Sequence, residues 1–288
     1  MTFNHFLLAF ISHVSSGCTN NSPNDVFCET ASASGYRSIT KDGVIREYLL
    51  DVPESHDSTG SALPLVLNFH GSGGCPDDYR EAESDFRTLA NTHNFLLVYP
   101  QGVLDAEGLP EWRPIADSGT SIQDNDFIFV EEIIADISRE YNVDTEAIYA
   151  IGLSNGGMMA YGLACRRGNL IAAAGIVSAT MLTDTCDQNA YTSIIHLHGS
   201  ADNIVPLEGN QDFPAVTTGI EYWKTHNNTM TSTSDELNNG SVTREVYSGG
   251  IEDTSVVLYT IQNGSHIWFN DTIDGQSPNQ ILWDFVSQ

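Results

Sequence analysis

The sequence predicts an α/β protein with a mostly parallel central sheet, helices on both faces of that sheet and an N-terminal β-hairpin. Apolar segments of strand length alternate with segments of helical periodicity over most of the 288 residues. Alternation of this kind produces a parallel sheet that helices cover on both sides. No Pro-rich or Gly/Ser-rich linker divides the chain. We therefore expect residues 36–288 to form a single domain, preceded by an irregular lead-in over residues 1–35.

The first expected strands form the hairpin. Tyr36–Thr40 and Val44–Val52 flank Lys41–Asp42–Gly43, where Asp-Gly is a turn signal. The next strands are short apolar runs at 63–69 and 95–99, as expected for strands that are buried on both faces. The same reasoning places the later strands at 147–151, 170–177, 193–197, 242–247 and 255–261.

Helices are expected between these strands. In Asp126–Tyr141, apolar side chains recur at helical spacing and define one buried face. Residues 102–123, which include Glu111–Trp112–Arg113–Pro114, have no clear element, and loops of that length are often functional. The other predicted helices cover 77–91, 156–165, 213–226 and 277–286.

Residues 6–11 form a short apolar run, followed by small polar residues up to Gly17. This pattern is similar to a secretory signal and predicts a secreted or periplasmic protein. Because no Lys or Arg precedes the run, a frayed or mis-started N-terminus is the alternative. No other segment reaches the roughly 20 apolar residues that span a bilayer, so no membrane anchor is expected.

The five cysteines contain no CxxC pair, which argues against a structural zinc site, and we expect no metal. Export would permit disulfides. The simplest pairing joins Cys18 to Cys28 and Cys165 to Cys186 and leaves Cys75 free, although spacing alone does not fix connectivity.

The chain carries 11 Lys and Arg against 38 Asp and Glu, which gives a formal net charge of −27. Proteins that bind nucleic-acid backbones or anionic membranes need clustered cations. The cations of this sequence are scattered, so we expect neither nucleic acid nor a membrane as a partner.

The strongest functional signal is Gly152–Leu153–Ser154–Asn155–Gly156, a G-x-S-x-G motif between a predicted strand and a predicted helix. This context places Ser154 on a sharp turn, where its hydroxyl projects above the sheet edge as a nucleophile. Glycines keep the turn free of side-chain collisions, and the helix N-terminus favours developing negative charge. The alternative is a Gly-rich turn in which Ser154 only caps the helix.

A nucleophilic serine needs a base to take its proton and an acid to orient that base. In the fold that uses this motif, the chain order is Ser, Asp, His. Asp202 and His266 each follow a predicted strand in that order, at the sheet edge where α/β proteins place their sites. Of the nine histidines, only His266 combines the right order with a Gly-flanked loop after a strand. The alternative for Asp202 is the capping of a surface turn.

An acyl-transfer site also needs two backbone N–H groups that stabilise the oxyanion. We expect one from Asn155, directly after the nucleophile. The other is expected from Ser72, with Gly71 as the alternative, in the HGSGG loop (70–74) that follows the strand at 63–69. The loop lacks the Lys-Ser/Thr of a P-loop, which argues against phosphate binding. His70 is expected to brace this loop rather than to transfer a proton.

Five segments together resemble a known family: HGSGG (70–74), YPQG (99–102), GLSNGGMMAYGLAC (152–165), HGSADNIVP (198–206) and GSHIW (264–268). They are similar to the secreted feruloyl esterases and polyhydroxybutyrate depolymerases of the α/β-hydrolases, alongside carbohydrate esterases of the acetyl-xylan type. The resemblance runs from about residue 36 to the C-terminus. It implies the α/β-hydrolase fold and the triad Ser154, Asp202 and His266, and it supports the Cys165–Cys186 disulfide.

The sequence also departs from the pattern of this family. Phe269 follows Trp268, where the family usually has Pro, and residues 102–123 have their own composition. Both places are expected to touch substrate. Trp268 and Trp112 are candidate walls of the substrate pocket, with packing in the core as the alternative for each, and His70 of the HGSGG loop is the third candidate substrate-binding residue.

These features predict a secreted serine carboxylesterase that hydrolyses hydroxycinnamoyl (feruloyl-type) or related esters of plant polysaccharide. The reaction would pass through an acyl-enzyme and needs no cofactor. The expected partner is the ester substrate, either a small molecule or a polysaccharide side chain. The alternatives are a polyhydroxyalkanoate or polyester depolymerase or oligomer hydrolase, and an acetyl-xylan esterase. A non-catalytic relative that only binds a ligand is a further alternative, against which the intact Ser, Asp and His argue.

Overall fold

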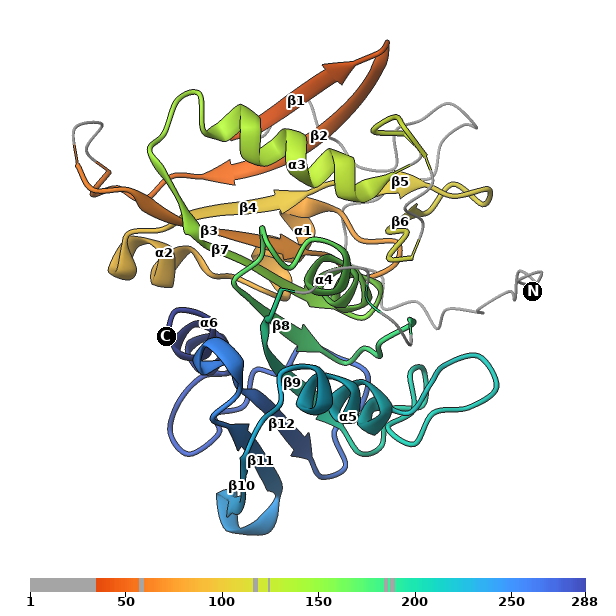
Figure 1. Ribbon diagram of the computed structural model, residues 1–288. Coiled ribbons are helices and arrows are strands. Elements are labelled where there is room, and N and C mark those ends of the chain that lie inside the picture. The colour runs from red at the N-terminus through yellow and green to blue at the C-terminus, as the bar shows by residue number, and fades with distance from the viewer. Residues whose placement is uncertain (1–34, 57–59, 116–118, 124, 184–185, 187–189) are drawn as a thin grey trace.

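The computed structural model describes residues 35–56, 60–115, 119–123, 125–183, 186 and 190–288. In these residues a 10-stranded sheet has the order β1-β2-β4-β3-β7-β8-β9-β12-β11-β10 and runs through the whole molecule (Figure 1). Its strands are β1 (Tyr36–Lys41), β2 (Val44–Asp51), β3 (Leu63–Phe69), β4 (Leu96–Pro100), β7 (Val143–Leu153), β8 (Ala173–Val177), β9 (Ser193–Gly199), β10 (Thr231–Leu237), β11 (Val242–Ser248) and β12 (Val256–Ile261).

The centre of the sheet, from β4 through β3, β7, β8 and β9 to β12, is parallel. The strands at both ends pair antiparallel, including the expected N-terminal hairpin, in which Lys41 pairs with Val44. The predicted fold class is confirmed. Because the central strands run in one direction, their carboxyl ends meet at one edge, which is where α/β sheets bind their ligands.

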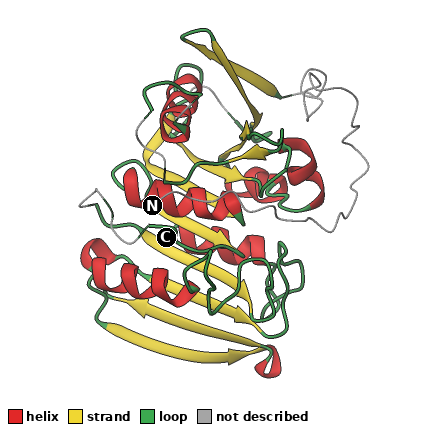
Figure 2. Ribbon diagram, turned by 90° about the vertical axis from the view of Figure 1, so that its right-hand side faces the viewer, coloured by secondary structure: helices red, strands yellow, loops and turns green. Residues whose placement is uncertain are grey.

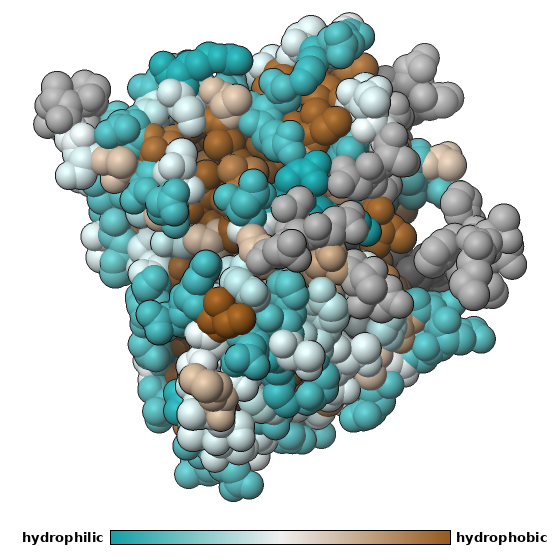
Figure 3. Space-filling model, in the orientation of Figure 1, coloured by the Kyte–Doolittle hydropathy of each residue, from teal (hydrophilic) through white to brown (hydrophobic). Residues whose placement is uncertain are grey.

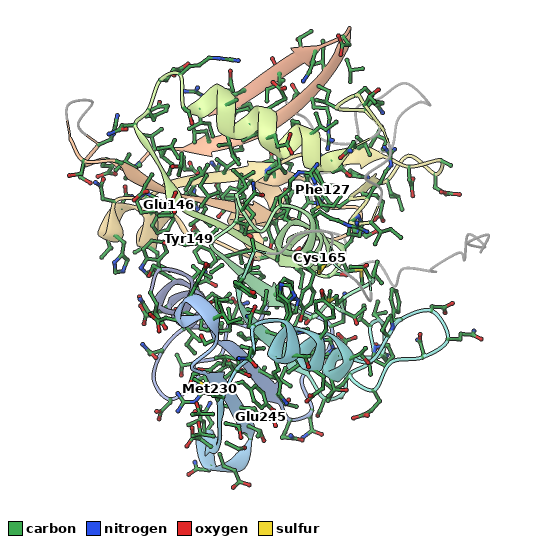
Figure 4. The ribbon with its side chains drawn as sticks, in the orientation of Figure 1. Phe127, Glu146, Tyr149, Cys165, Met230 and Glu245 are labelled. Atoms are coloured by element: carbon green, nitrogen blue, oxygen red, sulfur yellow. A yellow bond between two sulfur atoms is a disulfide. The ribbon has the colours of Figure 1, made fainter. Side chains whose placement is uncertain are left out.

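Helices cover both faces of the sheet, as Figure 2 shows from the side. The hydrophobic core is divided into two clusters, one on each face; Phe127 and Cys165 belong to one and Tyr149 of β7 to the other (Figure 4). The helices α3 (Asp126–Ile137), α4 (Asn155–Arg166) and α5 (Val216–His226) pack on the first face, and α1 (Pro76–Ala82), α2 (Arg87–His93) and α6 (Pro278–Val286) on the second.

The helix expected at 77–91 is broken into α1 and α2. The break lies at Ser84, which is completely buried. Its Oγ accepts a hydrogen bond from Asn68 Nδ2 at 2.8 Å, and its carbonyl oxygen accepts one from the Tyr99 hydroxyl at 2.6 Å. Buried polar groups need such partners, so these contacts from β3 and β4 fix a bend that the apolar spacing does not reveal.

Three further strands were not predicted. The edge strand β10 pairs only with β11 and is mostly exposed, so its sequence TSTSDEL has no apolar alternation that would indicate a strand. Within 102–123, the two-residue strands β5 (Val103–Leu104) and β6 (Pro110–Glu111) pair as a small hairpin. The loop expected to lack regular structure therefore contains an ordered element.

The structure forms the expected disulfide between Cys165 and Cys186. Cys75 is also disulfide-bonded, so the expectation that it is free is wrong. The expected Cys18–Cys28 pair and the apolar run at 6–11 lie outside the described residues.

Replacing both Cys165 and Cys186 with alanine should lower the free energy of unfolding by roughly 3 kcal/mol, because the disulfide restricts the unfolded chain. The two cysteines are separated by 21 positions in the sequence, which sets the size of the closed loop. Urea denaturation under non-reducing conditions measures this change in the free energy of unfolding, with the disulfide-bonded wild type as the reference. An unchanged midpoint and slope would contradict the prediction.

The face drawn in Figure 3 is mostly hydrophilic, and its larger apolar areas lie in the upper half, where Figure 1 places α3 and the first strands. Among the helices of the described residues, none has the length and apolar character needed to cross a membrane.

Candidate active site

Ser154 lies between β7 and α4, in a backbone conformation that few residues adopt. Its φ is 53° and its ψ −122°. Non-glycine residues with positive φ carry local strain, and such strain is concentrated at functional sites. The turn is held by two backbone hydrogen bonds of 2.9 Å, from the Ser154 amide to the Val177 carbonyl and from the Met158 amide to the Ser154 carbonyl. The Ser154 side chain makes no capping hydrogen bond, so the alternative of a merely capping serine does not hold.

The glycines around Ser154 permit very close packing of backbone. A Cβ at Gly156 would overlap the carbonyl oxygen of Phe69 at the end of β3 and would lie 2.5 Å from that of His70. A Cβ at Gly152 would overlap the Gly156 carbonyl. The absence of side chains therefore lets α4 begin directly against the end of β3, which brings the HGSGG loop next to Ser154.

Gly156→Ala should destabilise the protein by about 3 kcal/mol or more, although alanine favours helix over glycine by up to about 1 kcal/mol. The collision with rigid backbone outweighs the helix propensity. Gly108→Ala is the control, because Gly108 has a φ of +84° but nothing within 4 Å of an added Cβ. It should cost only roughly 1 to 2 kcal/mol from its backbone conformation. Thermal unfolding of both variants makes the comparison, and equal losses would contradict the prediction.

The structure brings Ser154, His266 and Asp202 into one hydrogen-bonded line. His266 Nε2 lies 2.9 Å from Ser154 Oγ, and His266 Nδ1 lies 2.8 Å from Asp202 Oδ2. A carboxylate only accepts, so Nδ1 carries the proton and Nε2 is free to accept the hydroxyl proton of Ser154. Asp202 follows β9 and His266 follows β12, so parallel strands deliver both side chains to the edge where β7 ends.

The carboxylate of Asp202 is buried and held by other groups besides His266. Its Oδ1 accepts hydrogen bonds from the amides of Ile204 and Val205, both at 2.9 Å. Its Oδ2, which faces His266, lies 3.4 Å from Nε2 of the buried His198. The alternative of a surface-turn cap accounts for the two amide bonds, but it does not account for the bond to His266.

Behind Asp202 lies a chain of buried side chains. The Tyr161 hydroxyl lies 2.8 Å from His196 Nδ1, His196 Nε2 lies 3.1 Å from His198 Nδ1, and His198 Nε2 lies 2.9 Å from the Val205 carbonyl. Burial lowers the pKa of both histidines, so they are neutral. The carbonyl of Val205 can only accept, so Tyr161 donates to His196, His196 donates to His198, and His198 donates to that carbonyl. His198 links this chain to the site, because its Nε2 lies 3.4 Å from Asp202 Oδ2.

The HGSGG loop lies beside Ser154, as predicted. A Cβ at Gly71 would be 3.6 Å from the Cβ of Ser154. The amides of Gly73 and Gly74 donate to the carbonyls of Pro110 and Gly71, at 2.8 and 3.0 Å. Within the described part of the chain, the amides of Ser72 and Asn155 have no such acceptor, which leaves them available to an oxyanion. Their role stays a prediction.

Glu111 was not predicted as a site residue, yet it contacts the HGSGG loop. The Ser72 hydroxyl donates to Glu111 Oε1. Burial raises the pKa of Glu111 to about 7, an effect that the hydrogen bond from Ser72 partly offsets. The sequence signal was the unassigned EWRP stretch, but only the fold places it against a loop that lies 39 positions earlier.

The three candidate substrate-binding residues are buried instead. Trp112 and Trp268 are each 3% exposed. Trp112 Nε1 donates to the His70 carbonyl at 3.0 Å, and Trp268 Nε1 donates to Asn279 Oδ1 at 2.8 Å. Trp268 also packs edge-on against Tyr79 and Phe86. These contacts favour the alternative that both tryptophans pack in the core, and they leave little indole surface for a ligand to contact.

His70 braces its loop. Burial lowers its pKa to about 4, so the ring is neutral at physiological pH. Its Nδ1 donates to the Gly71 carbonyl at 2.7 Å, and its Nε2 accepts from the Gly102 amide at 3.0 Å. Both ring nitrogens are thus engaged with backbone, which leaves His70 no contact to offer a substrate.

Two isoleucines that sequence reasoning missed flank the triad. Ile204 is 37% exposed and Ile267 49% exposed, and they lie within two residues of Asp202 and His266. The Ile267 carbonyl accepts a hydrogen bond from Ser178 Oγ at 2.9 Å, which fixes its loop. Exposed apolar side chains next to a polar site are suited to contact the apolar part of a ligand. Their positions, directly beside motif residues, were the available signal.

The sequence matches the protein family described as Esterase PHB depolymerase over residues 48–217, more than half of the chain. It is 28% identical to a bifunctional acetylxylan esterase/xylanase from Neocallimastix patriciarum over 229 residues. This match covers 78% of this chain and 31% of that protein. It is 25% identical to feruloyl esterase C from Emericella nidulans over 169 residues, and this match covers 57% of each of the two chains. The chain thus spans about a third of the first relative and little more than half of the second.

Solved structures with the same fold include an acetyl xylan esterase from Aspergillus awamori, with a TM-score of 0.64 at 13% identity over 88% of this chain and 98% of that chain. Thermogutta terrifontis esterase 2 phosphonylated by cyclosarin gives a TM-score of 0.55 at 14% identity over 90% of this chain and 92% of that chain. Identities this low show the fold alone. The fold is the α/β-hydrolase fold, as expected.

Proposed function

The chain belongs to the family described as Esterase PHB depolymerase, and from this premise we propose that it is a serine carboxylesterase. The observation that carries the proposal is the line of hydrogen bonds from Ser154 through His266 to Asp202. A strained serine, a base in the correct tautomer and a buried carboxylate are the parts that acyl transfer requires.

In the proposed reaction, Ser154 Oγ attacks the ester carbonyl while His266 Nε2 takes its proton. Asp202 holds the imidazole and stabilises its charged form. The amides of Ser72 and Asn155 donate to the oxyanion of the tetrahedral intermediate. The intermediate collapses to an acyl-enzyme when His266 gives its proton to the leaving alcohol. A water molecule, deprotonated by His266, then attacks the acyl carbon, the bond from that carbon to Ser154 Oγ breaks, and His266 returns the proton to Ser154 as the acid leaves.

The proposed substrates are hydroxycinnamoyl (feruloyl-type) or related esters of plant polysaccharide. Two relatives support this class, because their names describe a feruloyl esterase and an acetylxylan esterase. Ile204 and Ile267 support an apolar group on the ester, since burial of an apolar ring against them would contribute binding energy. With Trp112 and Trp268 buried, these isoleucines replace the tryptophans as the proposed contacts.

Acetyl-xylan esterase and polyester depolymerase or oligomer hydrolase are the alternatives. The name of the Neocallimastix patriciarum relative favours the first, and the description of the family favours the second. Both use the same triad and differ only in the group that the site accepts. We further propose that the protein is exported, which the Cys165–Cys186 disulfide supports because disulfides persist in oxidising compartments.

A hydrolysis panel of methyl ferulate, p-nitrophenyl acetate, acetylated xylan and a polyhydroxybutyrate film tests the substrate. We expect the protein to release ferulate from methyl ferulate faster than it releases product from the film, at equal enzyme concentration. We also expect Ile267→Ala to lower kcat/KM for methyl ferulate more than kcat/KM for p-nitrophenyl acetate. A loss of about 10-fold corresponds to the burial of roughly one apolar side chain against a ring. Ser154→Ala gives the background rate. Rapid clearing of the film without ferulate release would overturn the feruloyl choice and favour the polyester alternative.

A further inference from the structure

We propose that Glu111 is a positioning residue for the oxyanion hole and that the segment 110–112 clamps together the two parts of the chain that supply the hole. The inference rests on the proposed function, since it concerns the same site. The contacts that carry it belong to the hairpin of β5 and β6, which the reaction described above does not use.

The first half of the clamp acts on Ser72. The peptide that carries the Ser72 N–H also carries the Gly71 carbonyl, and that carbonyl accepts hydrogen bonds from His70 Nδ1 at 2.7 Å and from the Gly74 amide at 3.0 Å. The peptide bonds of the described residues include no cis bond, so the Ser72 N–H points away from this carbonyl. Fixing the carbonyl therefore fixes the direction of the N–H.

The hairpin strand β6 holds the same loop from its other side. The Gly73 amide donates to the Pro110 carbonyl at 2.8 Å, and the Ser72 hydroxyl donates to the Glu111 carboxylate. The backbone of Glu111 is in turn packed closely on Gly102, where an added Cβ would lie 2.8 Å from the Glu111 carbonyl oxygen. The backbone of Glu111 is thus packed against another part of the chain, and its carboxylate accepts the hydrogen bond that holds the Ser72 side chain.

The second half of the clamp acts on Asn155, the residue that supplies the other N–H. Asn155 Oδ1 accepts from the Trp112 amide at 2.6 Å, and Asn155 Nδ2 donates to the Trp112 carbonyl at 3.1 Å. Trp112 is anchored in the core and donates to the His70 carbonyl. Consecutive residues, Glu111 and Trp112, therefore hold the two proposed oxyanion donors relative to each other.

The distance between the two donors matters most in the transition state. The oxyanion forms only when the carbonyl becomes tetrahedral, so misplaced donors should lower kcat and leave KM largely unchanged. A residue that bound the substrate in its ground state would instead change KM. This difference separates positioning by Glu111 from direct substrate binding.

The test is a double-mutant cycle of Glu111→Ala and Ser72→Ala, measured with p-nitrophenyl acetate. Ser72→Ala removes the hydroxyl but keeps the backbone N–H. Each single variant should lose about 10-fold in kcat, part of the 100- to 1,000-fold that a lost oxyanion donor costs, and the double variant should lose no more. Glu111→Gln retains a carbonyl acceptor and should recover activity to within about 3-fold of wild type. Glu107→Ala is the matched control, an exposed glutamate in the same hairpin loop, and should have wild-type kcat.

Several results would overturn the proposal: kcat of Glu111→Ala within twofold of wild type, additive losses in the double variant, or a loss carried by KM. Hydrogen exchange of the Gly73 amide gives a readout that needs no turnover, and it should accelerate in Glu111→Ala and stay unchanged in Glu107→Ala. If the wild-type protein hydrolyses no ester, the proposed function fails, and with it the oxyanion role of Glu111. Unchanged exchange in an active Glu111→Ala variant rejects the clamp alone.

Discussion

Ser154→Ala should reduce kcat for p-nitrophenyl acetate by at least about 1,000-fold, because it removes the atom that forms the acyl-enzyme. The residual rate would come from the oxyanion donors and substrate binding alone. His266→Ala should lose activity on the same scale, and the double variant should be no slower, since the residues act as a unit. Initial rates of purified variants, each checked by circular dichroism, measure the effect.

Ser234→Ala is the control for this substitution. Ser234 is exposed on the edge strand β10, away from the site, so its loss should leave kcat unchanged. Near-wild-type turnover by a folded Ser154→Ala variant would show that another group is the nucleophile. The strained turn at Ser154 would then need a different explanation.

Asp202→Asn should lower kcat by about 10,000-fold, which is more than the loss of a single charge in a polar site would suggest. The reason lies in the geometry of the carboxylate. Its Oδ1 accepts from the Ile204 and Val205 amides, so the carbonyl oxygen of an asparagine must keep that position. The NH₂ group then faces His266 Nδ1 and donates to it. Nδ1 must lose its proton and Nε2 must gain one, so the imidazole can no longer accept the Ser154 proton.

The matched control for this substitution is Asp212→Asn, an exposed aspartate on the loop after β9, which should keep wild-type kcat. Because Asp202→Asn retains the two amide hydrogen bonds, its melting temperature should stay close to that of wild type. A kcat within 10-fold of wild type would contradict the assigned tautomer. A lower melting temperature would show that the variant has lost stability, so the thermal melt separates a folding defect from a loss of catalysis.

Much of the site could be predicted from the sequence because its parts depend on local rules. The G-x-S-x-G turn is defined by residues that adjoin one another, and Asp202 and His266 each follow an apolar strand of a parallel sheet. A parallel sheet brings such positions to one edge, whatever the distance along the chain. The structure accordingly joins Ser154 to His266 across 112 positions.

The features that were missed depend on tertiary contacts. Ser84 breaks the helix at 77–91 because Asn68 and Tyr99 reach it from two strands. Trp112 and Trp268 are of a residue type that often lines pockets, but both pack in the core. Phe69 packs against Trp112, and Tyr79 and Phe86 pack against Trp268. The role proposed for Glu111 depends on its hydrogen bond with Ser72, and nothing within the hairpin itself indicates that contact. The local sequence pattern does not indicate which side chains, distant along the chain, will contact a given residue in the folded protein.

The role of Ser154 as the nucleophile is tested by identifying the residue that carries the acyl group. The protein is mixed with methyl ferulate or p-nitrophenyl acetate, quenched in acid to trap the intermediate, digested and examined by mass spectrometry. We expect an acyl group on the peptide that contains Ser154 and on no other, and we expect it to be absent from Ser154→Ala. An acyl group on a different residue, or turnover at an undiminished rate in Ser154→Ala, would contradict this role.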